Sequence, residues 1–283
     1  MTKQGIVTKC VGGKCHVICN KDYYTCTIRG IFRKHDKSPI VGDEVIINIT
    51  DENKKLGTIH EILERKNFLI RPRVVNLTQV IVTISIKDPE FNPGLLDRIL
   101  ALVEYEDIPI IICVNKTDLD EADFEKIFAP YRAVGYPVVY VSTYTKAGLD
   151  SLISLLGNEI SLFAGPSGVG KSSIINALIP ELNLLTGDLS EKNQRGKHTT
   201  RNSELFPIGG GFIFDTPGFV SLELDHIDKD DRSFCFKEFR PFLGQCKFVN
   251  CKHISEKDCA IKEEIGKSIH PGRYESYLGV LNA

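Results

Sequence analysis

The chain has 283 residues, of which 42% are apolar and 25% charged, a composition typical of a soluble globular protein with two or three domains. Its longest strongly apolar run covers about seven residues around positions 108–114, whereas a bilayer span needs roughly 20. Residues 1–10 lack the apolar core of a signal peptide. We therefore expect a cytoplasmic protein that does not enter a membrane.

The net charge of -2 is distributed unevenly along the chain. Residues 1–73 carry 14 Lys and Arg against 8 Asp and Glu, residues 74–228 carry 11 against 21, and residues 229–283 carry 10 against 8. An acidic middle between basic ends predicts that a polyanion would bind the two ends. Each basic end, taken alone, is equally typical of an ordinary solvated surface.

Nine cysteines in a chain without a secretory signal indicate reduced thiols or metal ligands rather than a disulfide framework. Four of them, Cys10, Cys15, Cys19 and Cys26, lie among predicted strands. Because their spacing matches no metal site and free cysteines are often buried, we interpret these four as buried thiols.

Residues 1–66 alternate short β-branched or aromatic runs with turns, including predicted strands at Tyr23–Ile28, Val45–Ile49 and Thr58–Leu63. This spacing is typical of a small all-β barrel or sandwich. Arg29, Phe32 and the basic residues at 33–35 combine cations with an aromatic ring, which suits contact with phosphates and stacked bases, although the signal is weak by itself.

From residue 74 onward, predicted strands and helices alternate. The strands are Val74–Ile86, Ile108–Val114, Val138–Val141 and Ile160–Ala164, and the helices are Pro93–Glu106, Glu121–Val134 and Ala147–Leu156. Such alternation predicts an α/β domain with a mostly parallel, doubly wound sheet, whose ligands bind at the carboxyl ends of the strands.

The segment GPSGVGKS, residues 165–172, follows a predicted strand and opens a predicted helix at Ser173–Leu178, so it matches the P-loop pattern in its required context. Glycines let the backbone turn tightly and aim N–H groups at phosphates, Lys171 reaches the β and γ oxygens, and the Ser172 hydroxyl suits Mg²⁺. The predicted phosphate-binding residues are Gly165, Pro166, Ser167, Gly168, Val169, Gly170, Lys171, Ser172 and Ser173.

The segment NKTD, residues 115–118, ends a predicted strand, where a sheet of this kind binds its ligands. The Asp118 carboxylate can accept from N1–H and N2–H₂ of guanine, Asn115 can address the opposite base edge, and the Lys116 stem can cover the ring. Adenine offers a carboxylate no such pair of donors, so the motif favours guanine. Ser142, at another strand end, is either a further base contact or an ordinary strand-end serine.

The segment DTPG, residues 215–218, closes the predicted strand Gly211–Phe214 and provides Asp215 for the Mg²⁺ shell and the Gly218 N–H for the γ-phosphate. The first switch is predicted at about 187–201, with Thr199 or Thr200 sensing Mg²⁺ and γ-phosphate. Phe219 stands where many GTPases have a water-orienting Gln, so His198 is the candidate catalytic residue. The alternative for His198 is a surface residue that faces phosphate or RNA.

Because NKTD and Ser142 precede the P-loop instead of following DxxG, the domain is predicted to be circularly permuted. The strings LLDRIL with Glu104, NKTD, GPSGVGKSSIINAL, GKHTT and DTPGF, with the Cys-His pattern of the tail, make the chain resemble the circularly permuted GTPases of small ribosomal subunit biogenesis. The family commonly has Arg where this chain has Lys197.

That resemblance implies an N-terminal OB-fold that binds RNA over residues 1–68, a circularly permuted GTPase domain over 69–222 and a zinc-binding, mostly helical domain over 223–283. It further implies late maturation of the small subunit, binding to its rRNA, and hydrolysis of GTP to GDP that the subunit stimulates. We expect a monomer.

The tail pattern Cys246-x₄-Cys251-x-His253-x₅-Cys259 offers three thiolates and one imidazole, a set suited to one closed, structural Zn²⁺ site. By size alone the tail is expected to be too short to hold a core unaided, and zinc binding would supply folding free energy. Buried free cysteines are the alternative, and Cys235 and His270 are possible substitute ligands.

Two other functions fit parts of the sequence. One is an RNA-binding assembly protein whose nucleotide site only senses GTP and GDP, which predicts no turnover. The other is a P-loop phosphotransferase of a different kind, which the NKTD motif disfavours.

Overall fold

The computed structural model describes residues 1–30, 32, 38–69, 73–121, 123–182, 184, 203–215 and 227–282, with the Asp215 side chain excepted. By contacts these residues divide into two compact units. One comprises residues 1–79, 153–163 and 203–215, and the other comprises residues 80–152, 164–184 and 227–282. Among the described helices, none is both long and apolar enough to cross a membrane.

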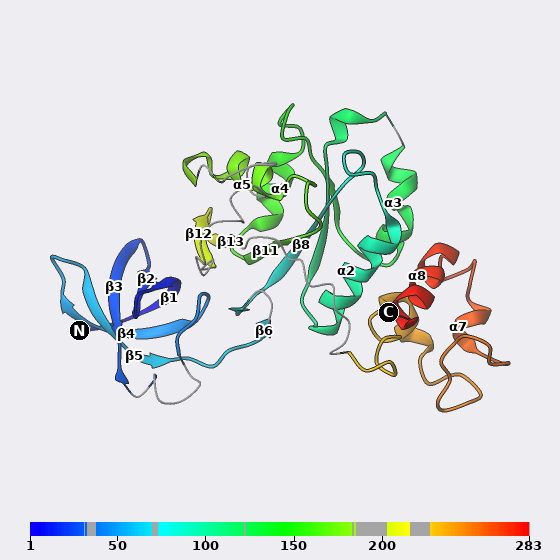
Figure 1. Ribbon diagram of the computed structural model, residues 1–283, viewed down its shortest axis with the longest axis horizontal. Coiled ribbons are helices and arrows are strands. Elements are labelled where there is room, and N and C mark those ends of the chain that lie inside the picture. Colours follow the sequence, from blue (N-terminus) through cyan, green and yellow to red (C-terminus); the bar gives the residue numbers. More distant parts are fainter. Residues whose placement is uncertain are drawn as a thin grey trace, which may run out of the picture. The chain divides into compact units, whose positions relative to one another are not determined.

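The N-terminal strands of the first unit close into a five-stranded barrel in the order β1-β2-β3-β5-β4 (Figure 1). Alternate residues point inward because side chains alternate across a strand, and the inward ones, such as Val17, Tyr24 and Ile47, form the barrel core. The predicted OB-like barrel is confirmed. Its strands are β1 Thr2–Val11, β2 Lys14–Cys19, β3 Asp22–Ile28, β4 Glu44–Asp51 and β5 Leu56–Ile62.

Two of the barrel cysteines form a disulfide, which corrects the prediction that all nine are thiols or metal ligands. Cys10 and Cys15 are opposite residues in the β1–β2 ladder and are bonded to each other. Ladder pairing brings their side chains together on one face, which spacing along the chain did not reveal. Cys19 and Cys26 are free and buried, as predicted.

The predicted strand Val74–Ile86 is two strands. β6 (Phe68–Leu69) pairs with β7 (Val74–Val75), and three residues separate Val75 from the start of β8 (Gln79–Ser85). Asn76 separates them with a left-handed backbone at φ 57°. Its side chain donates to the Gly42 carbonyl and accepts from the Lys66 N–H. Polar contacts with residues distant in sequence therefore end the strand that the apolar run predicted.

In the second unit, β8 (Gln79–Ser85), β9 (Ile110–Asn115) and β10 (Val138–Tyr140) pair in parallel. All residues of β8 and β9 are buried, which explains their mostly apolar sequences. The connecting helices follow as predicted, with ends that differ by up to three residues. They are α2 Pro93–Tyr105, α3 Phe124–Ala133 and α4 Leu149–Leu156, with the short 3₁₀ helix η1 at Thr117–Leu119.

β11 (Ile160–Ala164) pairs in parallel with β13 (Gly211–Asp215) and leads into α5 (Lys171–Leu178) and the 3₁₀ helix η2 (Pro180–Leu182). β12 (Glu204–Ile208) is a strand that the sequence prediction missed, and it runs antiparallel to β13. Ile208 pairs with Gly211 across Gly209-Gly210, a two-residue hairpin signal that would have revealed it.

The described part of the tail shares a core with α2, which agrees with the expectation that so short a segment would not hold a core unaided. Ala101 and Leu102 of α2 pack with Phe236, Phe239 and Tyr277 of the tail. A short tail can be stable in this way because α2 adds apolar residues to its core. The tail elements are the 3₁₀ helix η4 Lys237–Phe242, α7 Ala260–Glu263 and α8 Pro271–Asn282.

Candidate functional site

The phosphate loop, residues 165–170, joins β11 to α5, and three of its glycines have positive φ. Gly165 has φ 142°, and a Cβ there would collide with the Thr83 carbonyl oxygen on β8. Gly170 has φ 93° and is the N-cap of α5, and a Cβ there would collide with the Asn115 side chain. The loop therefore requires glycine for its close approach to β8 and to the end of β9.

Lys171 is the first residue of α5, and its Nζ donates to the Gly165 and Pro166 carbonyls, each at 2.7 Å. Burial lowers the pKa of Lys171 to about 8. A partly desolvated ammonium beside free backbone N–H groups at a helix N-terminus is an arrangement that favours phosphate. Ser172 and Ser173, in the first turn of α5, are half-buried.

Asn115 links the phosphate loop to residues 115–118, the base-reading segment that the sequence predicts. It ends β9, is fully buried, and its Nδ2 donates to the Val169 carbonyl at 2.9 Å. Its Oδ1 is buried without a hydrogen-bond partner among the described residues. An orphaned acceptor at this place is a polar group that a bound ligand or water would satisfy.

Asp118 and Ser142 are brought together, as their strand-end positions suggested. Asp118 lies in η1 and is exposed, and its Oδ1 accepts from Ser142 Oγ at 2.5 Å. Ser142 Oγ in turn accepts from the Thr145 N–H at 3.0 Å. Lys116 has a left-handed backbone at φ 61°, and its Nζ donates to the Asp88 carbonyl. The Asp118 carboxylate is thus held at the surface with Oδ2 available to accept from a ligand.

Several predicted site residues fall outside the described part. His198, Thr199, Thr200 and Gly218 lie beyond the described residues, and only the backbone of Asp215, the last residue of β13, is described. The roles predicted for these five residues stay predictions.

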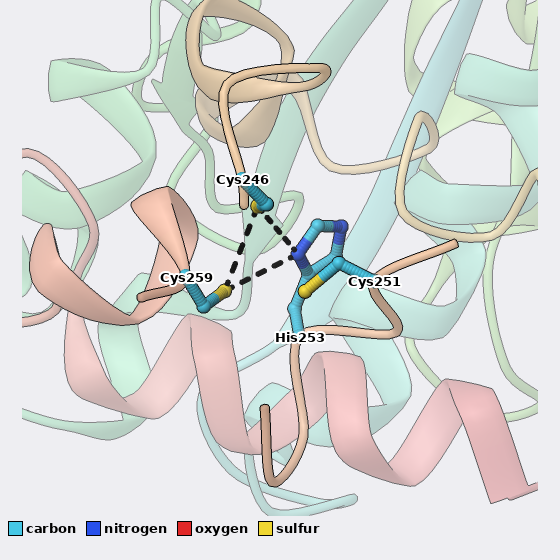
Figure 2. Close-up of side chains that lie close together, drawn as sticks. All are labelled: Cys246, Cys251, His253 and Cys259. Atoms are coloured by element: carbon cyan, nitrogen blue, oxygen red, sulfur yellow. Dashed lines mark hydrogen bonds between the residues drawn. The ribbon is translucent and has the colours of Figure 1, made fainter. Parts of the chain in front are cut away.

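The four predicted metal ligands of the tail converge on one point (Figure 2). His253 Nδ1 lies 3.5 Å from Cys246 Sγ and 3.4 Å from Cys259 Sγ, the two sulfurs are 3.8 Å apart, and all four ligand atoms lie within 4.8 Å of one another. Ligand atoms around a tetrahedral metal with bonds of about 2.0 Å to nitrogen and about 2.3 Å to sulfur lie about 3.5 to 3.8 Å apart. The group can therefore hold a metal ion.

The protonation of these ligand side chains also suits a bound cation. Burial raises the pKa of the Cys251 thiol to about 12 and lowers the pKa of His253, so these two side chains favour their uncharged forms until a cation displaces the thiol proton. Cys235 is buried in the core shared with α2, and His270 is exposed and accepts from the Gly272 N–H. Neither belongs to the converging group.

A buried ion-pair network between α2 and the tail was missed at the sequence level. Arg273 of α8 donates to Asp97 of α2 at 2.6 Å and to both carboxylate oxygens of Glu238 at 2.6 and 3.0 Å. Arg240 donates to Glu104 of α2 at 2.6 Å. The signal was present, since Asp97 and Glu104 are charged residues on the apolar face of a predicted helix.

The chain matches known families and structures over almost its full length. Residues 62–225 match the family model described as RsgA GTPase, and residues 4–59 match the RsgA N-terminal domain. A small ribosomal subunit biogenesis GTPase RsgA of Geobacillus thermodenitrificans is 45% identical over 281 residues, which are 97% of this chain and 95% of the relative. A relative of the same name from Clostridium botulinum is 39% identical over 98% of this chain and 96% of its own.

Two solved structures have the same fold. YjeQ from Thermotoga maritima superposes with a TM-score of 0.87 at 34% identity, covering 100% of this chain and 98% of its own. YloQ, described as a circularly permuted GTPase, superposes with a TM-score of 0.83 at 35% identity, covering 100% of this chain and 94% of its own. The circular permutation predicted from the order of the motifs is confirmed.

Proposed function

Because the chain belongs to the RsgA GTPase family, we propose that it hydrolyses GTP on the assembling small ribosomal subunit, assists late maturation of that subunit and leaves after hydrolysis. The observation that carries this proposal is the Asn115–Val169 hydrogen bond. It joins a base-reading segment and a phosphate loop, far apart in the chain, into one nucleotide site.

In this site the phosphate loop provides backbone N–H groups and Lys171 for the phosphates, while Asp118 accepts from the guanine N1–H and N2–H₂. Ser142 holds Asp118 in place through its hydroxyl. The Ser172 hydroxyl and the Asp215 carboxylate are the oxygen ligands that Mg²⁺ prefers. When bound, the ion would offset the negative charge that builds up on the β and γ phosphates.

For hydrolysis we assign the orientation of the attacking water to His198, since Phe219 occupies the place of the usual Gln. Thr199 or Thr200 would sense the γ-phosphate, and Gly218 would donate its N–H to it. An imidazole is suited to this role because it accepts and donates protons near neutral pH.

One structural Zn²⁺ ion fits the tail, held by Cys246, Cys251, His253 and Cys259. Three thiolates and an imidazole satisfy four-coordinate zinc and leave no position open for catalysis. The ion would fix the turns of a segment that has few helical residues.

The partner is the small subunit and its rRNA, and the chain would act as a monomer in the cytoplasm, where that subunit is assembled. Supporting this are the names of the relatives and the net positive charge of residues 1–73 and 229–283, which suits a phosphate backbone. The barrel adds an RNA-binding surface of the kind found in OB-folds.

Sedimentation of the full chain with purified small subunits tests this function. With a non-hydrolysable GTP analogue the protein should co-sediment with the subunit, and with GDP it should stay in the supernatant. Equal binding with the analogue, with GDP and without nucleotide would contradict the proposed cycle. ATP analogues should not replace GTP analogues.

A further inference from the structure

An apolar cavity of about 150 Å³ separates the start of α2 from the phosphate loop. Asn92, Leu95 and Leu96 line it on the α2 side, and Pro166, Ser167 and Val169 line it on the loop side. The first turn of α2 and the phosphate loop thus form two walls of one cavity. The position of α2 therefore bears on the shape of the nucleotide site.

The residue after Leu96 binds the tail. Asp97 lies on α2 with its side chain 1% exposed, and it accepts from Arg273 of α8, whose side chain is 2% exposed. The Arg273 guanidinium also binds both oxygens of Glu238 and lies 5.0 Å from the centre of the Phe236 ring. A guanidinium that binds two carboxylates and packs on an aromatic ring can adopt few rotamers. These contacts therefore favour one position of α8 along α2.

The next residues of α8 hold the metal-binding segment. The Tyr274 hydroxyl donates to the His253 carbonyl at 2.6 Å, and the Tyr277 hydroxyl donates to the Lys252 carbonyl at 2.8 Å. His253 is itself one of the converging ligands. An uninterrupted series of contacts thus runs from the metal ligands through α8 and Arg273 to the wall of α2 that faces the phosphate loop.

The charged groups at the centre of this series point to a conformational role. Burial alone would lower the pKa of Arg273, but Asp97 and Glu238 outweigh it and raise that pKa, so Arg273 stays charged. Buried ion networks are often no more stabilising than apolar residues of the same size, and their best-attested role is to fix one register. An apolar replacement would keep the core but allow α2 and α8 to shift against each other.

We propose that Arg273 is a positioning residue that couples the metal site of the tail to the nucleotide site, so that Zn²⁺ and guanine nucleotide each strengthen the binding of the other. This goes beyond the proposed ribosomal function. Coupling of two binding sites is reciprocal, so both ligands must show the same factor. A factor of about five or more is typical of such coupling.

Equilibrium binding on the full chain, without ribosomes and without turnover, tests the proposal. Zinc affinity is measured by competition with a chelator in the presence and absence of saturating GDP, and GDP affinity is measured with and without Zn²⁺. The wild type should show the same factor, about five-fold or more, in both experiments. A factor of one in either experiment would overturn the proposal.

Replacing Arg273 alone would leave two carboxylates buried without a partner and could unfold the tail. The decisive variant is therefore the triple change Arg273→Met, Asp97→Leu and Glu238→Met, which removes all three charges and keeps apolar volume. It should retain zinc and GDP binding and its unfolding temperature, but the coupling factor should fall to about one.

Two further variants serve as comparisons. Tyr274→Phe with Tyr277→Phe removes only the two hydroxyls that reach the metal segment, and it should lower the factor without loss of the core. Arg132→Met removes a solvent-exposed ion pair with Glu125 on α3 and should leave the factor at the wild-type value. A folded triple variant with undiminished coupling would refute the role of Arg273, while failure of the ribosomal function would show only in sedimentation and turnover.

Discussion

At the scale of single residues, Asp118 and Lys171 have the most specific proposed roles in binding the nucleotide. One is an exposed carboxylate held by Ser142, and the other is an ammonium whose burial places its pKa at about 8. In the proposed function, the first would determine which base is bound, and the second would determine how the binding of phosphate depends on pH.

Asp118→Ala should weaken GTP and GDP equally, by roughly 3 kcal/mol, because hydrogen bonds to a charged acceptor contribute about 1.5–3 kcal/mol each. Asp118→Asn should gain affinity for xanthosine nucleotides, since an amide can donate to the xanthine O2. Titration calorimetry measures both, with the exposed Glu121→Ala as the control variant. Wild-type protein that binds ATP as tightly as GTP would refute the assignment.

Binding of GDP should take up a proton near pH 8. Lys171 is largely neutral above a pKa of about 8, and phosphate binds the charged form, so affinity should fall as pH rises from 8 to 10. Calorimetry at pH 8.5 in two buffers of different ionisation enthalpy measures the proton uptake. An observed heat independent of the buffer would contradict the burial of Lys171.

The stability of the fold should change with pH in the opposite direction to the affinity for GDP. The pKa of Lys171 is lowered from 10.5 in the unfolded chain to about 8 in the folded one, so the unfolded chain binds more protons between these values. Burial of the charged lysine therefore lowers the free energy of unfolding by its full amount below pH 8. This loss decreases as pH rises from about 8 to 10.5.

At the scale of elements, the phosphate loop depends on a glycine at its closest approach to β8. Gly165→Ala should reduce GDP affinity strongly, because the new Cβ would collide with the Thr83 backbone in addition to adopting a strained φ. Gly135→Ala is the matched control, since Gly135 also has positive φ, 94°, but open space around it. It should cost only about 1–2 kcal/mol of stability. Equal losses of GDP affinity in both variants would argue against the tight loop.

In the tail, Cys251→Ser should remove zinc and lower the unfolding temperature, since three ligands cannot close the tetrahedral site. Cys235→Ser, which alters a buried cysteine outside the ligand group, should retain one zinc per chain. Elemental analysis and thermal unfolding distinguish the two variants. Wild-type protein purified without chelator and free of zinc would contradict the site.

Particular elements show what local sequence could and could not predict. β9 and the helix after it follow from apolar runs and caps, because local periodicity decides them. The break at Asn76 and the Cys10–Cys15 bond depend on contacts with residues distant in sequence or opposite in a ladder. For the same reason the metal ligands, close in sequence and fixed in spacing, were predictable, whereas Arg273, 176 positions from its Asp97 partner, was not.

At the scale of the whole molecule, the chain combines a basic barrel, an acidic GTPase middle and a basic tail whose Cys and His side chains could hold a metal ion. The middle has no Gln after DTPG, so free protein should hydrolyse GTP slowly. The basic N-terminal and C-terminal segments suit a polyanionic partner, which would orient the catalytic groups. Stimulation should weaken steeply with added salt if phosphate contacts dominate docking.

GTP turnover measured against a titration of purified small ribosomal subunits tests this account most directly. The rate should rise by roughly 10³ to 10⁵, the range seen when a partner completes a GTPase site. His198→Ala should keep its affinity for GTP and lose most of the stimulated rate, because the residue acts on water and not on the bound nucleotide. Turnover that stays unchanged at saturating subunit would contradict the central claim, and full stimulation of the His198→Ala variant would contradict the catalytic assignment.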